Sequence, residues 1–88
     1  MDRFNGYSNF ATLMFHTEID NHYNTYQSIK TFVAANPLVT VAELAQHLQS
    51  YNSIVRKLNS GVNLNQVNYV EIANDILLDV LQMLEYNQ

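Results

Sequence analysis

The sequence has no cysteine and no tryptophan, only two glycines and one proline in 88 residues, and few charged side chains. Without cysteine there is no disulfide framework, thiolate metal site or cysteine nucleophile, so zinc fingers are excluded and a reducing compartment is consistent with the composition. So few glycines and prolines cannot supply the many tight turns of an all-β domain. The composition therefore favours long helices joined by short connections.

The length suits one domain with one modest hydrophobic core, because 88 residues leave little room for a deep enzyme cleft beside that core. Hydrophobic residues make up 48% of the chain, yet no window approaches 18 consecutive apolar residues. The first residues also lack the pattern of a signal peptide. We therefore expect a single cytoplasmic domain over residues 1–88, with an ordered core at about 8–86 and no membrane contact.

Capping residues and proline mark where the predicted helices begin and end. Proline disfavours helical geometry in the residue before it, so Pro37 ends one helix. Thr40 and Glu43 have the spacing of a capping box at the start of the next helix, and Asn68 repeats the capping pattern before the last. The sequence predicts an all-α bundle of four helices, over residues 9–20, 22–35, 41–58 and 69–85.

Apolar residues at helical spacing predict the buried faces. For the first three helices these faces contain Phe10, Leu13, Met14 and Thr17, then Tyr23, Tyr26, Ile29 and Val33, then Val41, Leu44, Leu48 and Val55. The fourth helix has the longest apolar run and is expected to form the core with Ile72, Ile76, Leu77, Val80 and Leu84. Ser8 is expected to cap the first helix, with Tyr7 as a hydrophobic staple, and the third helix is expected to bend near Asn52-Ser53.

Two segments carry short motifs, namely Asn5-Gly6-Tyr7-Ser8-Asn9-Phe10-Ala11-Thr12 with Ile19-Asp20-Asn21, and Val67-Asn68-Tyr69-Val70-Glu71-Ile72-Ala73. They resemble a small uncharacterised family of bacteriophages and mobile elements. Its usual opening is Asn-Gly-aromatic-x-Asn-aromatic-x-Thr, followed by an Ile-Asp-Asn-like step, and its closing helix contains aromatic-x-Glu-Ile-Ala. The resemblance implies a phage or mobile-element setting and a helical fold, and it brings no known activity.

Four possible metal ligands, His16, Glu18, Asp20 and His22, lie within seven residues at the end of the first predicted helix. His16 and Asp20 have the i, i+4 spacing that places two side chains on one helical face. Glu18 points elsewhere, His22 lies beyond a break, and no His-Glu-x-x-His pattern is present. We expect a solvated helix end here, with no metal and no cofactor, and we expect His47 on the surface.

The sequence offers little for catalysis or for direct binding of nucleic acid. No serine lies in a Gly-x-Ser-x-Gly elbow, and no glycine-rich phosphate loop is present. The only adjacent basic pair is Arg56-Lys57, against a formal net charge of −4. We therefore expect neither an enzyme nor a protein that binds nucleic acid directly.

An acidic stripe runs along the last predicted helix, where Glu71, Asp75 and Asp79 repeat every fourth residue. Carboxylates at this spacing lie ~6 Å apart, close to the spacing of phosphates along a nucleic-acid strand. The stripe could therefore occupy a basic groove of another protein. With only three charges in line, the array is more typical of a solvated helix face that keeps a small acidic protein in solution.

These features lead to two hypotheses of function. The first is a non-enzymatic, phage-type protein that binds a host protein, for example a defence complex that it inhibits, through the acidic stripe. The alternative is a self-associating structural module, in which Leu78 and Met83 form the edge of a homodimer. Tyr51 and Tyr86 could lie at an interface in either case, whereas Tyr23 and Tyr26 fit the core.

Overall fold

The computed structural model of the protein describes residues 6–86, and the side chains of residues 81 and 83–86 are outside that description. The regular elements in this part are all helices, namely α1 (Phe10–Asn21), α2 (Tyr23–Ala35), α3 (Val41–Leu48), η1 (Gln49–Tyr51), α4 (Asn52–Leu58), η2 (Leu64–Gln66) and α5 (Tyr69–Tyr86). The predicted all-α fold is confirmed. The predicted third helix is divided into α3 and α4 by the 3₁₀ turn η1, which begins slightly before the expected bend.

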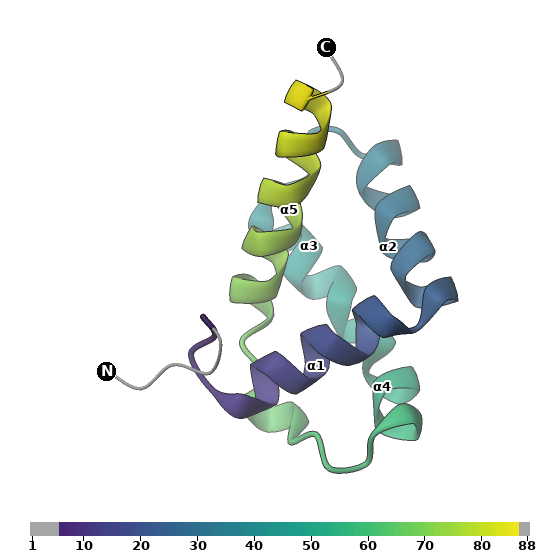
Figure 1. Ribbon diagram of the computed structural model, residues 1–88, viewed down its shortest axis with the longest axis vertical. Coiled ribbons are helices and arrows are strands. Elements are labelled where there is room, and N and C mark those ends of the chain that lie inside the picture. Colours follow the sequence, from purple (N-terminus) through teal and green to yellow (C-terminus); the bar gives the residue numbers. More distant parts are fainter. Residues whose placement is uncertain (1–5, 87–88) are drawn as a thin grey trace.

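The helix α1 crosses the lower part of the molecule, and α2 and α5 extend upward from it on either side, with α3 passing behind α5 (Figure 1). The most extensive contact between helices joins α3 to α5, while α1 contacts α2, α4 and α5 in turn. The placement of α1 therefore decides how the end of α2 and the start of α5 are oriented toward each other.

The core contains side chains from every α-helix. Those with the least exposure are Thr12, Phe15, Ile19, Leu44, Leu48, Val55 and Ile72. The ring of Phe15 meets the edge of Tyr69 at 5.3 Å between centroids, and the Tyr69 hydroxyl donates to Asn52 Oδ1 at 2.8 Å. Ile72 and Ile76 are buried as predicted, whereas Leu77 and Val80 are half-buried. The side chain of Leu84 lies outside the described part.

The predicted buried face of α1 is wrong. Phe10 is 55% exposed and Thr17 is exposed, whereas Phe15 and Ile19 are almost fully buried. Helix α1 has neighbours on several sides, so apolar residues occur around much of its circumference and no single stripe stands out. Its buried face also includes the polar Thr12, which an apolar pattern does not detect.

The prediction that Tyr23 and Tyr26 lie in the core is also wrong. Their exposed fractions are 72% and 37%, while Ile29 and Val33 of the same helix are buried. Helix α2 lies at the edge of the bundle and packs chiefly on α1, so only a narrow face of it is covered. A tyrosine can remain at such an edge because its hydroxyl is hydrated while its ring covers apolar neighbours.

The helix caps are set by local hydrogen bonds. The capping box of Thr40 and Glu43 is confirmed, with both reciprocal bonds present at 2.9 and 3.1 Å. Asn68 caps α5 as predicted, because its Oδ1 accepts from the Glu71 amide at 3.1 Å. The cap of α1 is Asn9 and not Ser8, since Asn9 Oδ1 accepts from the Thr12 amide at 2.8 Å.

The starts of α1 and α5 are fastened to each other by three further hydrogen bonds. The Asn68 amide donates to Thr12 Oγ1 at 2.9 Å, and the Asn9 side chain donates to the carbonyl of Gln66 at 2.8 Å. The Ser8 amide donates to Glu71 Oε1 at 2.8 Å. We call Ser8, Asn9, Thr12, Asn68 and Glu71 the capping clasp. All five belong to the two motif segments of the sequence.

A second polar contact joins α2 to α3 and η1. The His47 ring stacks on Phe32 at 3.7 Å between centroids, with 6° between the ring planes, and its Nε2 lies 3.1 Å from the Tyr51 hydroxyl. That hydroxyl also lies 2.8 Å from Ser28 Oγ. The surface position expected for His47 is therefore wrong, because Phe32 covers its ring. Tyr51, which could have lain at an interface or in the core, is 7% exposed and belongs to the core.

The buried hydroxyl of Thr12 generates a prediction for stability. Its Oγ1 donates to Asn9 Oδ1 at 2.8 Å and accepts from the Asn68 amide in a part-buried bond, so Thr12→Val leaves that amide without its acceptor. We expect Thr12→Val to lower the free energy of unfolding by about 2–3 kcal/mol in urea denaturation. Thr12→Ser keeps the hydroxyl and should cost less. Equal losses in the two variants would show that the hydroxyl is not what matters.

The environment of His47 generates a prediction for pH dependence. Burial lowers the pKa of the His47 imidazole below its usual 6.5, so the unfolded chain takes up this proton more readily than the folded chain. The resulting loss of stability begins as pH falls through 6.5 and is complete below the folded-state pKa. When the pH is lowered from about 8 to about 5, the free energy of unfolding of His47→Gln should fall less than that of the wild type. Parallel stability curves from urea denaturation would contradict this.

Candidate functional site

The negative charges of four carboxylates from two helices act on the phenol of Tyr7. Burial raises the pKa of Tyr7, and the negative charges of Asp75, Asp20, Glu71 and Asp79 raise it further. These four are half of the eight acidic residues in the chain. We call them the acidic face. It includes the predicted stripe of α5 and adds Asp20 from the end of α1.

The members of the predicted stripe differ in their surroundings. Glu71 is half-buried, and its carboxylate accepts the Ser8 amide as part of the capping clasp. Asp75 is half-buried and Asp79 is exposed. Leu78, which was expected at a partner edge, is 49% exposed, and the side chain of Met83 lies outside the described part. Glu71 therefore helps to hold α1 and α5 together, whereas Asp75 and Asp79 form no hydrogen bond of the capping clasp.

His16 connects Tyr7 to Asp20. Its Nδ1 lies 2.6 Å from the Tyr7 hydroxyl and its Nε2 lies 3.4 Å from Asp20 Oδ2, so the i, i+4 pair predicted from the sequence does form. The solvated helix end expected at this place is wrong for His16, which is only 7% exposed. The segment around Gly6 makes the contact possible, because Gly6 adopts a φ of 91°, a left-handed conformation that favours glycine.

The other two candidate metal ligands do not join His16 and Asp20. His22 lies at the junction of α1 and α2, where its Nδ1 is 2.7 Å from Thr25 Oγ1. Glu18 is half-buried elsewhere on α1. Within the described residues, no group of three or more histidine or acidic side chains is arranged to hold a metal ion.

A cavity of about 160 Å³ opens beside Asp20 and is lined by residues of α1, α2 and α5. Its lining residues are His16, Asp20, Tyr26, Ile29, Lys30, Ile76, Asp79 and Val80. Ile29 and Ile76 are buried, whereas the Asp20 side chain is 51% exposed and Asp79 is exposed. The cavity therefore has an aliphatic floor and a charged rim.

The two rim carboxylates influence each other electrostatically. Burial raises the pKa of Asp20, the positive form of His16 lowers it, and the charge of Asp79 raises it again. Asp20 and Asp79 belong to different helices, and they repel each other because both line the same cavity. Lys30 is the one basic residue in the lining, and its ammonium lies 5.1 Å from the centre of the Tyr26 ring.

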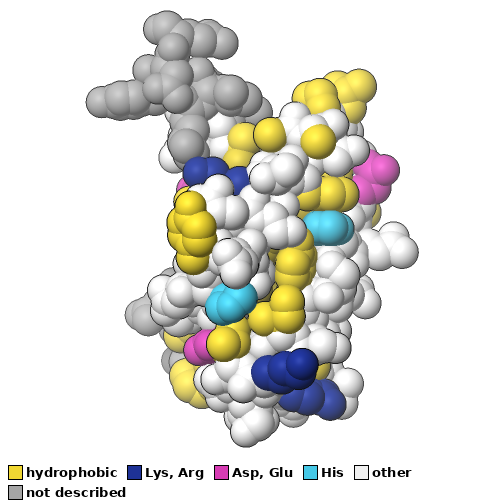
Figure 2. All heavy atoms as spheres, turned by 90° about the vertical axis from the view of Figure 1, so that its right-hand side faces the viewer, with side chains coloured by type: hydrophobic (Ala, Val, Ile, Leu, Met, Phe, Trp, Pro, Cys, Tyr) yellow, Lys and Arg dark blue, Asp and Glu magenta, His cyan; other side chains and the backbone are white. Residues whose placement is uncertain are grey.

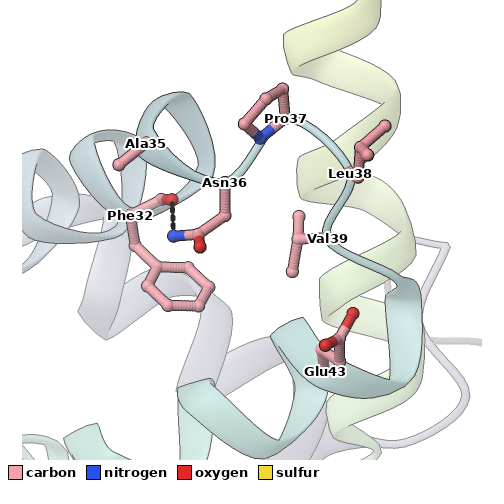
Figure 3. Close-up of a pocket in the computed structure, with 7 residues that line it drawn as sticks. All are labelled: Phe32, Ala35, Asn36, Pro37, Leu38, Val39 and Glu43. Atoms are coloured by element: carbon pink, nitrogen blue, oxygen red, sulfur yellow. Dashed lines mark hydrogen bonds between the residues drawn. The ribbon is translucent and has the colours of Figure 1, made fainter.

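A larger and more open cavity, of about 360 Å³, lies at the turn between α2 and α3 (Figure 3). Its walls are mostly apolar, and Leu38 beside it is 92% exposed. Asn36 donates to the carbonyl of Phe32 at 2.7 Å, and the hydrogen bonds from Thr40 lower the pKa of Glu43. Because the capping box occupies the carboxylate of Glu43, this cavity supplies shape and apolar surface but no free acid or base.

Basic side chains gather on another part of the molecule. Arg56 and Lys57 are both exposed on α4, and dark blue side chains mark this lower end of the molecule in Figure 2. Above them Figure 2 shows a second, smaller dark blue patch and isolated magenta side chains among hydrophobic and uncharged ones. The acidic face on α1 and α5 is therefore not neutralised by this basic pair.

Comparisons with family models, with curated proteins and with solved structures found no match to this chain. The site is accordingly described from its own geometry. None of the helices within residues 6–86 combines the length and apolar character that crossing a membrane requires.

Sequence reasoning found the stripe on α5 and the His16–Asp20 pair separately, because each follows from helical spacing. It missed that they form one surface, and it missed the cavity between them. Nothing in the spacing of either helix indicates that α1 crosses α5 at this point. The motif residues Asn9, Thr12 and Asn68 carried the only signal, since polar side chains at two helix starts suit hydrogen bonds between them.

Proposed function

We propose that this chain is a non-enzymatic, phage-type protein that binds a basic region of a host protein in the bacterial cytoplasm. Binding would occupy the host protein's nucleic-acid-binding groove and so inhibit a defence complex. The observation that carries this proposal is that Asp20 of α1 and Asp79 of α5 line one cavity, and their charges act on Tyr7 together with those of Asp75 and Glu71. A concentrated field of one sign accelerates association with an oppositely charged partner and favours one orientation of it.

The surroundings of His16 support binding over catalysis. Both ring nitrogens have neighbours, Tyr7 on one side and Asp20 on the other, and the side chain is almost fully buried. A general base must reach the proton that it removes from a substrate. His16 is therefore better suited to hold the N-terminal segment on α1 than to act on a substrate.

Self-association through α5 is the second candidate, because Leu78 and Val70 are 49% and 55% exposed and lie two turns apart on this helix. In a two-fold dimer the same surface meets itself. Leu78 lies next to Asp79 and one turn from Asp75, so such a dimer brings like charges of the two copies together. This repulsion makes a basic partner the better occupant of the surface.

The proposal predicts a charge-specific and salt-dependent loss of binding. The partner is first captured from host lysate at low salt and identified, and its affinity is then measured with purified proteins. We expect Asp75→Asn to weaken binding about fivefold at low salt, because a rim charge contributes up to about 1 kcal/mol. Raising the salt concentration should reduce this difference, since the Debye length shortens.

Glu18→Gln is the matched control, because it removes one carboxylate from α1 that does not act on Tyr7. It should change the affinity less than twofold. Glu71 is left intact in this comparison because its carboxylate holds the Ser8 amide. If Asp75→Asn and Glu18→Gln bind alike at low salt, the acidic face is not the binding surface.

A further inference from the structure

The cavity between α1, α2 and α5 is lined by aliphatic and by acidic side chains, and one kind of ligand can contact both. Ile29, Ile76 and Val80 supply an aliphatic floor, and Asp20 and Asp79 stand at the rim. A ligand that matches both parts has an alkyl chain with a positive charge at its end. Purely apolar ligands would leave the two carboxylates without a counter-charge, and small inorganic cations would leave the aliphatic floor uncovered.

The volume of the cavity limits which positively charged side chain fits it. Its volume of about 160 Å³ is close to that of cavities which accept a six-carbon ring, roughly 150 Å³. A lysine side chain, with four methylene groups and one ammonium, has a comparable number of heavy atoms. An arginine is longer and recognises a carboxylate best through a planar two-point contact. Asp20 already directs Oδ2 toward His16 at 3.4 Å, which leaves less of it free for such a contact.

The charges at the rim favour the same occupant. Asp20 and Asp79 come from different helices and repel each other across the opening, and an ammonium between them would relieve this repulsion. The lining also contains Lys30, the chain's own lysine at this cavity, but its ammonium lies 5.1 Å from the centre of the Tyr26 ring. Lys30 therefore contributes a competing positive charge at one side of the opening.

We propose that this cavity is a recognition pocket for one lysine side chain of the basic partner. The aliphatic part of that lysine packs on Ile29, Ile76 and Val80, and its ammonium lies between Asp20 and Asp79. This inference rests on the proposed function, and it adds a specific anchor to an otherwise diffuse electrostatic attraction. The acidic face accelerates the encounter, and the pocket selects the residue that docks.

The pocket can be tested without the partner by using n-butylammonium, which reproduces a lysine side chain. In a titration followed by NMR at constant ionic strength, we expect saturable shifts of the methyl signals of Ile29, Ile76 and Val80. The neutral analogue 1-butanol, which has the same number of carbons, should bind at least fivefold more weakly, because it lacks the charge. Methylammonium should also bind more weakly, because it lacks the alkyl chain.

Three variants make the test specific to the pocket. Asp79→Asn should weaken n-butylammonium binding about fivefold, whereas Asp75→Asn, on the same helix but outside the lining, should change it less than twofold. Lys30→Met keeps the aliphatic stem and removes the competing charge, so it should tighten binding. Circular dichroism and thermal melting of each variant show that the fold is retained.

The outcomes separate the pocket from the proposed function. If n-butylammonium produces no saturable shifts at these methyl groups, or if Asp75→Asn weakens its binding as much as Asp79→Asn, the lysine pocket is wrong. Loss of partner binding in Asp75→Asn would still support the acidic face in that case. If Lys30→Met weakens n-butylammonium binding, Lys30 forms part of the site instead of competing with it, which also overturns the arrangement proposed here.

Discussion

The Thr12 hydroxyl donates to Asn9 at the start of α1 and accepts from the Asn68 amide at the start of α5, inside the molecule. Leaving either partner unsatisfied in a buried place is costly, so the two helix starts are held in one relative position. The Asn9 side chain and the Ser8 amide add further bonds across the same junction. Because α1 is fixed at its beginning, its later turns cross between α5 and α2 at a defined place. The capping clasp thus determines which side chains of the two helices meet.

Both functional surfaces follow from that crossing. It brings Tyr7 and Asp20 beside the carboxylates of α5, which makes one acidic face from residues far apart in the sequence. It also leaves a cavity between the end of α1, the middle of α2 and α5, where the helices diverge. A surface charge and a shaped cavity act differently in recognition, since the first mainly affects encounter and the second affects which side chain can dock. In the function proposed above, the acidic face would therefore affect the encounter rate and the cavity would affect the choice of the docking residue.

Local patterns in the sequence predicted the features that depend on neighbouring residues. The capping box of Thr40 and Glu43, the cap at Asn68 and the helix end before Pro37 each involve backbone within a few residues. Burial was predicted less well for α1 and α2. The apolar stripe assigned to Phe10 was wrong because α1 is covered on several sides, and Tyr23 was assigned to the core although α2 lies at an edge. His47 was misplaced for a similar reason, since Phe32 of another helix covers its ring.

By itself, the sequence determined the helical class, the approximate helix boundaries, the spacing of carboxylates along α5 and the pairing of His16 with Asp20. Each of these depends on the period of a helix or on the chemistry of one turn, and both act within a few residues. Only the tertiary structure decided that Asp20 joins Asp75 and Asp79, that Glu71 holds the Ser8 amide, and that a cavity with an aliphatic floor lies between the helices. Those features depend on the angle and position at which helices cross, and these are set by the whole packed core together with buried hydrogen bonds such as that of Thr12.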